Sequence, residues 1–322
     1  MQCALITGGG GYIGTSLASS LITRGWDVTR LVRPGTMLHS SFGVETSEIE
    51  ADICDPDVWS KTGKQVDAIV HLAAQTSTYT AAEDPVADET ANLRPMIQLL
   101  ETCRKENWRP FIVLASTVTV IGLSQQMPVR EDHSYQPLTV YDLHKWMAEE
   151  YLKMYCRLGY ARGTTLRLAN VYGPGPTNRR TDRGVLNKMI RNALAGRPLT
   201  IYGTGEWLRD YIHVDDVAQA FIVALNHPDA VAGRHWIIAS GESWRMRDAF
   251  ALIADRVAHR TGLRVPVEHV DPPAELSPIE KRNFVADISG FSAATGWQPR
   301  VLLQEGIDQT IEAFMSEKAA VV

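Results

Sequence analysis

The fold is decided by the stretch Thr7-Gly8-Gly9-Gly10-Gly11-Tyr12-Ile13-Gly14, which lies between an apolar run and an amphipathic segment. The run at residues 4–7 is a predicted strand, and an apolar face that repeats every three to four residues predicts a helix after the loop. Glycines in the patterns TGxxGxxG and GxGxxG let a backbone turn sharply and approach a pyrophosphate closely, while the free N–H groups of the helix start face the phosphates. The position after the first strand favours this role over a purely structural turn. We therefore expect a dinucleotide site with contacts from Gly8, Gly11, Tyr12, Ile13 and Gly14.

Short apolar runs alternate with amphipathic segments through the first half of the chain. The runs at residues 4–7, 28–32, 68–72, 111–115 and 165–168 are predicted strands, and residues 95–103 and 141–158 are predicted helices. This alternation predicts an α/β fold, with a Rossmann-type doubly wound parallel sheet covered by helices on both faces.

The regular alternation breaks after Leu168. Residues 170–178 hold two glycines and two prolines, and residues 179–183 are basic and polar, so both segments are predicted loops. Beyond them we expect a helix at 185–194, a strand at 199–202, a helix at 214–225 and a strand at 236–239. The sequence thus predicts a dinucleotide-binding domain over residues 1–170 and a smaller substrate lobe over residues 171–322, with segments of the lobe returning to the sheet.

The composition excludes several classes of protein. The 322 residues are 45% hydrophobic and carry a net charge of -5, which gives no electrostatic reason to bind nucleic acid or an anionic membrane surface. No apolar run approaches the roughly 20 residues of a membrane helix, and the N-terminus shows no leader pattern. Four scattered cysteines, with no CxxC pair and no His/Cys cluster, predict reduced thiols and no metal site. We expect a cytoplasmic protein without nucleic-acid or membrane partners, which binds anionic ligands through local arginines.

The end of the second predicted strand bears on the choice of cofactor. An acidic residue there would bind the ribose 2′-hydroxyl of NAD, but the sequence is Leu31-Val32-Arg33-Pro34. Arg33 could pair with the 2′-phosphate of NADP or could be a solvated surface arginine, so both NADP and NAD stay open. Asp52 and Ile53 stand where such folds often contact the adenine ring.

Tyr141 and Lys145 are four residues apart on a predicted helix and therefore share one face. A tyrosine with a pKa of about 10 is a poor base at neutral pH, and a nearby ammonium group lowers that pKa. YxxxK alone is a frequent accident, but here it follows both the glycine loop and a strand that runs into Ser116-Thr117. Because the carboxyl end of that strand opens at the cofactor crevice, Thr117 can donate a hydrogen bond to a substrate oxygen. We predict that Tyr141 and Lys145 are the catalytic acid–base pair, with Thr117 as the third catalytic residue and His144 as a structural one.

Taken in order, these motifs resemble the extended short-chain dehydrogenases/reductases, in the NAD-dependent epimerase/dehydratase family that acts on nucleotide sugars. The resemblance extends over nearly the whole chain. Besides the motifs above, it rests on His71-Leu72-Ala73-Ala74, Asn92, Arg167-Leu168-Ala169-Asn170-Val171-Tyr172-Gly173-Pro174-Gly175, Leu199-Thr200-Ile201-Tyr202-Gly203, Arg209-Asp210-Tyr211-Ile212-His213-Val214-Asp215-Asp216 and Gly296-Trp297-Gln298-Pro299.

The resemblance implies a tightly held NAD or NADP, a nucleoside-diphosphate sugar as substrate, and a homodimer. The cofactor contacts that it adds are Leu72, Ala73, Ala74, Asn92, Tyr141 and Lys145. Asn170, Arg209 and Arg282 match positions that contact the diphosphate or nucleoside in relatives, a role that suits arginine because its planar fork binds phosphate bidentately. Arg209 could instead form an ion pair with Asp210 or Glu206 that only fixes its turn.

Departures from the family pattern narrow the reaction. Sugar 4,6-dehydratases and uronate decarboxylases carry an acid beside the catalytic Ser/Thr, but here Val118 and Thr119 follow Thr117. The usual YGxSK is Tyr141-Asp142-Leu143-His144-Lys145, and Ile121 replaces the tyrosine common before Gly122. The leading hypothesis is an NDP-sugar 4-epimerase that works through a transient 4-keto intermediate. The alternatives are an NADPH-dependent 4-keto-sugar reductase and a non-catalytic NAD(P)-binding sensor or scaffold, which would not need the acid–base pair.

Overall fold

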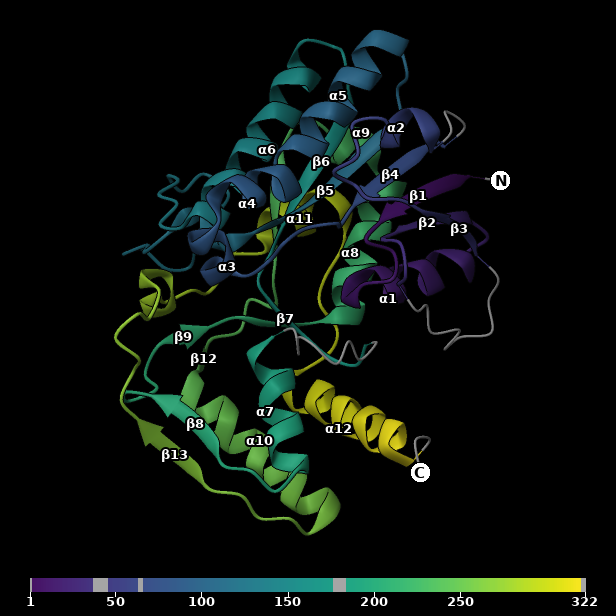
Figure 1. The fold of residues 1–322 in the computed structure, drawn as a ribbon. Helices are drawn as coiled ribbons and strands as arrows, with labels where there is room; N and C mark the ends of the chain where they lie inside the picture. Colours follow the sequence, from purple (N-terminus) through teal and green to yellow (C-terminus); the bar gives the residue numbers. More distant parts are fainter. Residues whose placement is uncertain (1, 37–45, 63–65, 176–183, 320–322) are drawn as a thin grey trace.

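The computed structural model describes residues 2–36, 46–62, 66–175 and 184–319, and a seven-stranded sheet lies at its centre (Figure 1). The strand order is β11-β6-β5-β4-β1-β2-β3, and every neighbouring pair is parallel. The strands are β1 (Cys3–Thr7), β2 (Asp27–Val32), β3 (Ser47–Glu50), β4 (Ala68–His71), β5 (Phe111–Thr117), β6 (Arg162–Leu168) and β11 (His235–Ile238). The doubly wound parallel sheet is thereby confirmed. The chain order reverses between β1 and β4, so the carboxyl ends of these strands flank the crevice in which such sheets bind ligands.

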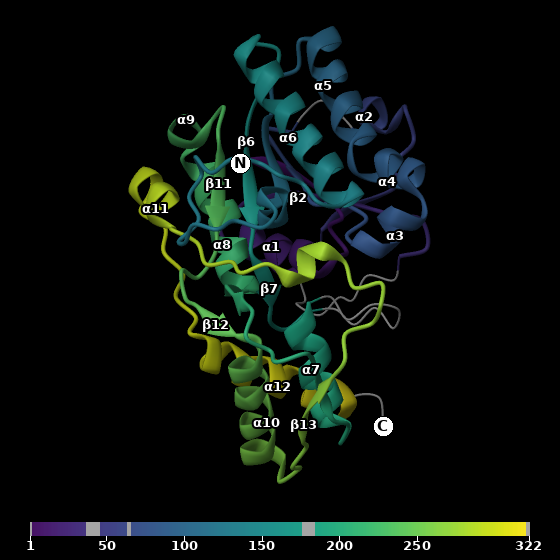
Figure 2. The ribbon, with the colours of Figure 1, turned by 90° about the vertical axis from the view of Figure 1, so that its left-hand side faces the viewer.

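Alternate residues of β1 serve opposite faces of the sheet. Ala4 and Ile6 pack in the core that includes α1 (Tyr12–Ile22) and α8 (Val214–Asn226), whereas Leu5 packs in the core under α5 (Arg94–Glu106) and α6 (Val140–Arg157). Figures 1 and 2 show these two helical layers with the sheet between them. The short helices α2 (Val58–Lys61), α3 (Thr78–Glu83) and α4 (Pro85–Asn92) lie on the α5 and α6 side, and α9 (Pro228–Val231) and α11 (Ser289–Thr295) lie near β11.

A second group of elements lies apart from the sheet, at the bottom of Figure 1. It contains α7 (Val185–Leu194), β8 (Leu199–Tyr202), α10 (Met246–Thr261), β13 (Val267–Val270) and α12 (Leu303–Ala319). Its own core includes Ile190, Phe250 and Ile307, all fully buried or nearly so. Two elements from the same half of the chain return to the sheet, since β11 pairs with β6 and α8 packs on α1.

Short strands connect the two groups. β7 (Asn170–Tyr172) pairs in parallel with β10 (Tyr211–His213), and β9 (Leu208–Arg209) pairs antiparallel with β12 (Trp244–Arg245). The expected loop at 170–178 is therefore wrong for its first three residues, because they find partners about forty positions further along the chain. The predicted loop at 179–183, like residues 176–178, lies outside the described residues.

β3 was not expected as a strand, since Ile49 is the only large apolar residue among its four. It lies at the edge of the sheet, where one neighbour, β2, supplies its hydrogen bonds. Two short 3-10 helices, η1 (Val118–Ile121) and η2 (Pro278–Lys281), complete the described elements. Within the described ranges, none of the helices combines the length and the apolar character needed to cross a lipid bilayer.

Candidate active site

The glycine loop is packed so closely that side chains would not fit. Gly8 has φ +67°, and a Cβ built on it would lie 3.0 Å from the backbone nitrogen of Ala73. A Cβ on Gly14 would lie 2.4 Å from the carbonyl oxygen of Gly8. The N-cap residue of helix α1 is Gly11, which has no side chain that could bond to the helix start. The first turn of α1 carries no acidic residue. The N–H groups at this helix start are therefore free of competing carboxylates, as an anion site at a helix N-terminus requires.

Thr7 fastens the loop to the segment after β4. Its hydroxyl accepts hydrogen bonds from the backbone nitrogens of Leu72 and Ala73, both at 3.1 Å, and it lies 2.9 Å from Nδ1 of His71. Burial, reinforced by the charge of Lys145, lowers the pKa of His71 to about 3, so this imidazole is neutral at physiological pH. The carboxyl ends of β1 and β4 are thus held together, and the expected cofactor contacts Leu72 and Ala73 lie against Gly8.

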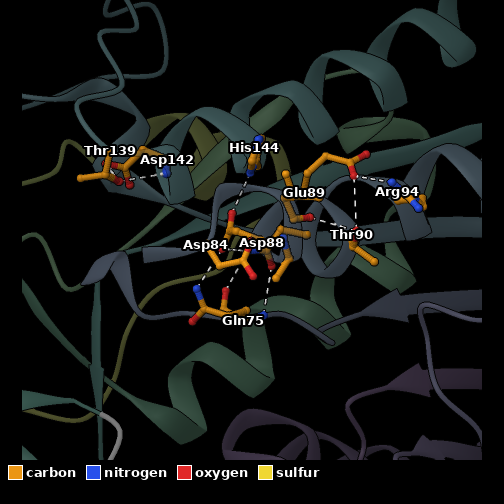
Figure 3. A network of polar contacts seen from close by, with 12 residues as sticks. Gln75, Asp84, Asp88, Glu89, Thr90, Arg94, Thr139, Asp142 and His144 are labelled. Atoms are coloured by element: carbon orange, nitrogen blue, oxygen red, sulfur yellow. Dashed lines mark hydrogen bonds and ion pairs between the residues drawn. The ribbon is translucent and has the colours of Figure 1, made fainter. Parts of the chain in front are cut away.

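Asn92 has an internal role in the structure. Its side chain accepts from the backbone nitrogen of Gln75 at 3.1 Å and donates to the Gln75 carbonyl and to Asp88, at 2.9 and 2.8 Å. Asp88 also accepts from the side chain of Gln75 and contacts Nδ1 of His144 at 2.7 Å, which links this network to α6 (Figure 3). The structural role expected for His144 therefore has a specific partner, and Asn92 fixes the segment that follows Ala74.

The three residues predicted as catalytic lie where β5 ends and α6 begins. Thr117 is the last residue of β5, Tyr141 is the second residue of α6, and Lys145 follows one turn later. Lys145 is 3% exposed, and burial lowers its pKa to about 8, against the opposing effect of Glu149 and Asp88. At neutral pH this lysine is still a cation beneath the helix start, as the lowering of a tyrosine pKa requires.

A chain of side-chain hydrogen bonds joins the end of β5 to the first turn of α6. The hydroxyls of Thr117 and Thr119 are 2.7 Å apart, and Thr119 donates to Oδ1 of Asp142. Thr139, the N-cap of α6, donates to Oδ2 of Asp142 at 2.7 Å. Asp142 is completely buried, and this burial raises the pKa of its carboxyl group, although the two threonine hydroxyls act against it.

The chain of hydrogen bonds includes one residue to which the sequence analysis assigns no role. The segment after Thr117 holds no acid, yet the structure brings a carboxylate to Thr119 from α6. Sequence reasoning noted that Asp142 replaces the usual glycine but gave it no role. The available signal was the spacing Thr139-x-x-Asp142, which is a form of capping box and predicts that the two side chains meet.

Three residues expected to bind substrate come together from distant segments. Arg282, just after η2, donates from Nη2 to Oδ1 of Asn170 at 3.0 Å. Arg209 donates from Nη1 to the backbone carbonyl of Arg282, so both guanidinium groups belong to one cluster. They are 3% and 7% exposed, and burial together with the charge of Arg282 lowers the pKa of Arg209 to about 10. Two buried cations side by side favour an anionic ligand between the lobes.

The alternative interpretation of Arg209 as an ion-pair partner of Asp210 or Glu206 is wrong. Asp210 accepts hydrogen bonds from Ser240, Gly241 and Ala286, while Glu206 pairs with Arg245 and Arg247. Arg209 instead donates to three backbone carbonyls, those of Leu208, Glu280 and Arg282, and its Nη2 lies 3.7 Å from the Glu280 carboxylate. The guanidinium therefore holds η2 in place, and a pocket lined in part by Leu123, Met127, Leu208 and Arg282 lies beside it.

Arg33 follows the carboxyl end of β2, and Asp52 and Ile53 follow that of β3. Arg33 is exposed directly after β2, and the backbone nitrogen of Ala51 donates to the carbonyl of Val32 at 2.9 Å, which brings the two segments together. Asp52 is exposed and accepts from the backbone nitrogen of Cys54 at 3.0 Å, whereas Ile53 is buried in the core. The arrangement leaves Arg33 and Asp52 accessible at the carboxyl end of β2.

The chain is similar to known proteins over most of its length. Residues 4–239 match the model of the NAD dependent epimerase/dehydratase family. A UDP-glucose 4-epimerase of Mycolicibacterium smegmatis is 32% identical over 97% of this chain and 98% of that protein.

Two solved structures extend the likeness to three dimensions. A UDP-glucose 4-epimerase of Thermotoga maritima with UDP-glucose is 26% identical and has a TM-score of 0.87, over 98% of this chain and 100% of that one. A UDP-glucose 4-epimerase of Thermus thermophilus in complex with NAD is 28% identical and has a TM-score of 0.84, over 98% and 99% of the two chains.

Proposed function

Because this chain belongs to the NAD dependent epimerase/dehydratase family, we propose that it is a UDP-sugar 4-epimerase that works through a transient 4-keto sugar. Two groups of residues, each at a different place in the fold, support the proposal. One is the Thr117, Tyr141 and Lys145 set where β5 and α6 meet, and the other is the pair of buried arginines between the lobes. The relatives with UDP-glucose and with NAD support the choice of ligands.

Each residue then has a defined task in the reaction. Tyr141 takes the proton of the sugar C4 hydroxyl and returns it after the 4-keto sugar has rotated in the site. Lys145 favours the tyrosinate, because a cation stabilises a nearby phenolate. Thr117 binds the C4 oxygen. The glycine loop and Lys145 would hold a nicotinamide cofactor, which would supply reversible hydride transfer at C4.

The lobe over residues 171–322 binds the nucleoside diphosphate in this proposal. Arg209 and Arg282 neutralise the diphosphate, and Asn170 holds Arg282 in position. Nε of Arg282 is buried and has no hydrogen-bond partner within the described residues, so it is available to a phosphate oxygen. The net charge of the chain is -5, and a dianionic ligand therefore requires such a local cluster.

The decisive experiment starts from the purified protein. It is denatured, the released dinucleotide is identified, and the native protein is then assayed for 4-epimerisation against UDP-, dTDP-, GDP- and CDP-sugars. We expect bound dinucleotide and turnover of a UDP-sugar with no net consumption of cofactor. Stoichiometric oxidation of added NADPH by a 4-keto sugar would instead establish the reductase alternative.

Tyr141→Phe tests the catalytic assignment within the same assay. The substitution keeps the ring and removes the proton carrier, so turnover should fall by roughly 10²–10⁴-fold while the bound dinucleotide is retained. Retention of nearly full activity would remove Tyr141 from the mechanism, whichever sugar proves to be the substrate.

Arg33 decides between the two forms of the cofactor. The relative from Thermus thermophilus binds NAD, while the exposed arginine after β2 suits the extra phosphate of NADP. If Arg33 pairs with the 2′-phosphate, Arg33→Ala should weaken NADP binding much more than NAD binding. Titration curves that change equally for both cofactors would reduce Arg33 to a surface residue.

A further inference from the structure

We propose that Asp142 is a positioning residue for Thr117, and that it acts through Thr119 to fix the orientation of the Thr117 hydroxyl beside the substrate. The inference rests on the proposed function, because it assigns the C4 oxygen of a sugar to Thr117. It concerns a residue that does not reach the substrate, since Asp142 is completely buried.

The two carboxylate oxygens of Asp142 serve different elements. Oδ2 accepts from the hydroxyl of Thr139, whose oxygen in turn accepts from the backbone nitrogen of Asp142 at 3.1 Å. Figure 3 shows this pair at the start of α6. These contacts are those of a helix cap, and one oxygen is sufficient for them. Oδ1 is directed instead to Thr119, which comes from the segment after β5.

The direction of the hydrogen bonds follows from counting protons. The hydroxyl of Thr119 donates its proton to Oδ1 of Asp142. The oxygen of Thr119 can then only accept from Thr117, which lies 2.7 Å away. The Thr117 oxygen also accepts from the backbone nitrogen of Thr119 at 3.2 Å. One lone pair of Thr117 is left, and these contacts fix its direction.

This arrangement fits the first half of an epimerisation. The substrate enters as an alcohol, and the single proton of its C4 hydroxyl passes to Tyr141. A Thr117 hydroxyl held in one orientation keeps the C4 oxygen in place while that proton moves. Small errors in the orientation of a reacting group are costly for turnover, because the bound geometry supplies much of the rate acceleration.

Burial of a carboxylate is the second sign that Asp142 does more than cap a helix. Helix caps are ordinarily exposed to water, and an ionised group out of water costs free energy unless it is well bonded. Arg282 is the charged group whose field favours the ionised form, and both threonine hydroxyls act in the same direction.

The test compares two hydroxyls that contact the same carboxylate. Thr119→Val breaks the link to Thr117 and leaves the cap, whereas Thr139→Ala removes the cap and leaves the link. We expect Thr119→Val to lower kcat by about 10–100-fold with unchanged dinucleotide content, and Thr119→Ser to restore it. Thr139→Ala should lower the melting temperature and leave kcat within about two-fold, since losing an N-cap affects stability. Equal losses of kcat in both variants, or wild-type kcat in Thr119→Val, would overturn the proposal.

An infrared titration separates this inference from the proposed function, since it needs no substrate. The carbonyl stretch of the protonated Asp142 carboxyl is identified by its loss in Asp142→Asn, and its midpoint is followed with pH. Thr119→Val should move that midpoint upward, because the lost hydrogen bond favoured the ionised form. An unmoved midpoint would refute the link itself. Absence of epimerisation by the wild-type protein, with the midpoint shifted as expected, would refute the proposed function and leave the link established.

Discussion

Replacement of Glu149 by glutamine tests how α6 is held against the sheet. Glu149 lies one turn after Lys145, and both its side chain and that of Arg167 on β6 are completely buried. Nε of Arg167 lies 3.0 and 3.1 Å from the two carboxylate oxygens, and Nη2 lies 2.5 Å from one of them. The hydroxyl of Ser116 on β5 donates to the same carboxylate. One side chain of α6 is thus bonded to two strands.

The size of the effect follows from what Glu149→Gln leaves behind. Burial alone would lower the pKa of Arg167, but in the wild type Glu149 outweighs burial and raises that pKa. The variant removes this carboxylate and leaves a buried guanidinium, which keeps its charge in proteins, without its partner. Removing one partner of a buried ion pair typically costs about 3–5 kcal/mol. The entropy of unfolding is about 2.1 cal/mol/K per residue, which gives roughly 0.7 kcal/mol/K for a chain of this length. The loss in free energy of unfolding therefore corresponds to a fall of about 4–7 °C in melting temperature.

The assay is a calorimetric melt of the apo-protein beside a matched control. Glu150→Gln changes the next residue of the same helix, where the carboxylate is 40% exposed and pairs with Lys153 at 2.7 Å. An exposed pair of this kind contributes about 0–1 kcal/mol, so the control should melt within about 1–2 °C of the wild type. The double variant Glu149→Leu with Arg167→Met should recover much of the loss, because apolar pairs often replace buried ion pairs at little cost. If Glu149→Gln had the same melting temperature as Glu150→Gln, the buried ion pair would not hold α6 to β6.

The remaining predictions concern the loop, the arginine cluster and Lys145. Gly14→Ala should abolish copurification of dinucleotide, because its Cβ would lie 2.4 Å from a backbone oxygen of Gly8 that cannot move aside; absorbance of the purified variant measures this. Arg209→Ala should both raise the KM for the UDP-sugar and lower the melting temperature, since three carbonyls lose their donor; an unchanged KM would end its diphosphate role. Burial lowers the pKa of Lys145 to about 8, below its value of about 10.4 in the unfolded chain, so its contribution to stability should rise between these pH values. Denaturant titrations should show this rise in the wild type and its absence in Lys145→Met.

The central sheet was predictable because its signals are local. Four apolar residues in a row in β1, followed by Thr7 and the glycines, determine a buried strand and a tight turn without reference to distant residues. The YxxxK spacing likewise depends only on helix geometry. β3 gave no such signal, since an edge strand needs few apolar residues.

The second lobe and the surroundings of the site depend on distant partners. β7 is a strand only because β10 runs beside it, and the sequence around Asn170 carries glycines and prolines that suggest a loop. The contacts of Arg209 involve backbone carbonyls near residue 280, which no side-chain pattern can reveal. The contact between Asp142 and Thr139 could have been predicted from the capping-box spacing. The hydrogen bond from Thr119 to Asp142 could not, because it depends on the packing of α6 against η1.

The place of β11 in the sheet has a consequence for how the chain folds during synthesis. Residues 162–168 form β6 early, but their outer neighbour is the segment at 235–238, and the helix that covers α1 begins at residue 214. At about 5–20 residues per second, a ribosome takes several seconds to make the intervening chain. During that time β6 has an unpaired edge, of the kind that recruits other strands, and Leu17 and Leu21 lack the apolar side chains of α8. A nascent chain that contains β6 but not yet α8 and β11 is therefore the form most in need of a chaperone. A chain truncated at residue 170 should aggregate rather than yield a dinucleotide-binding fragment.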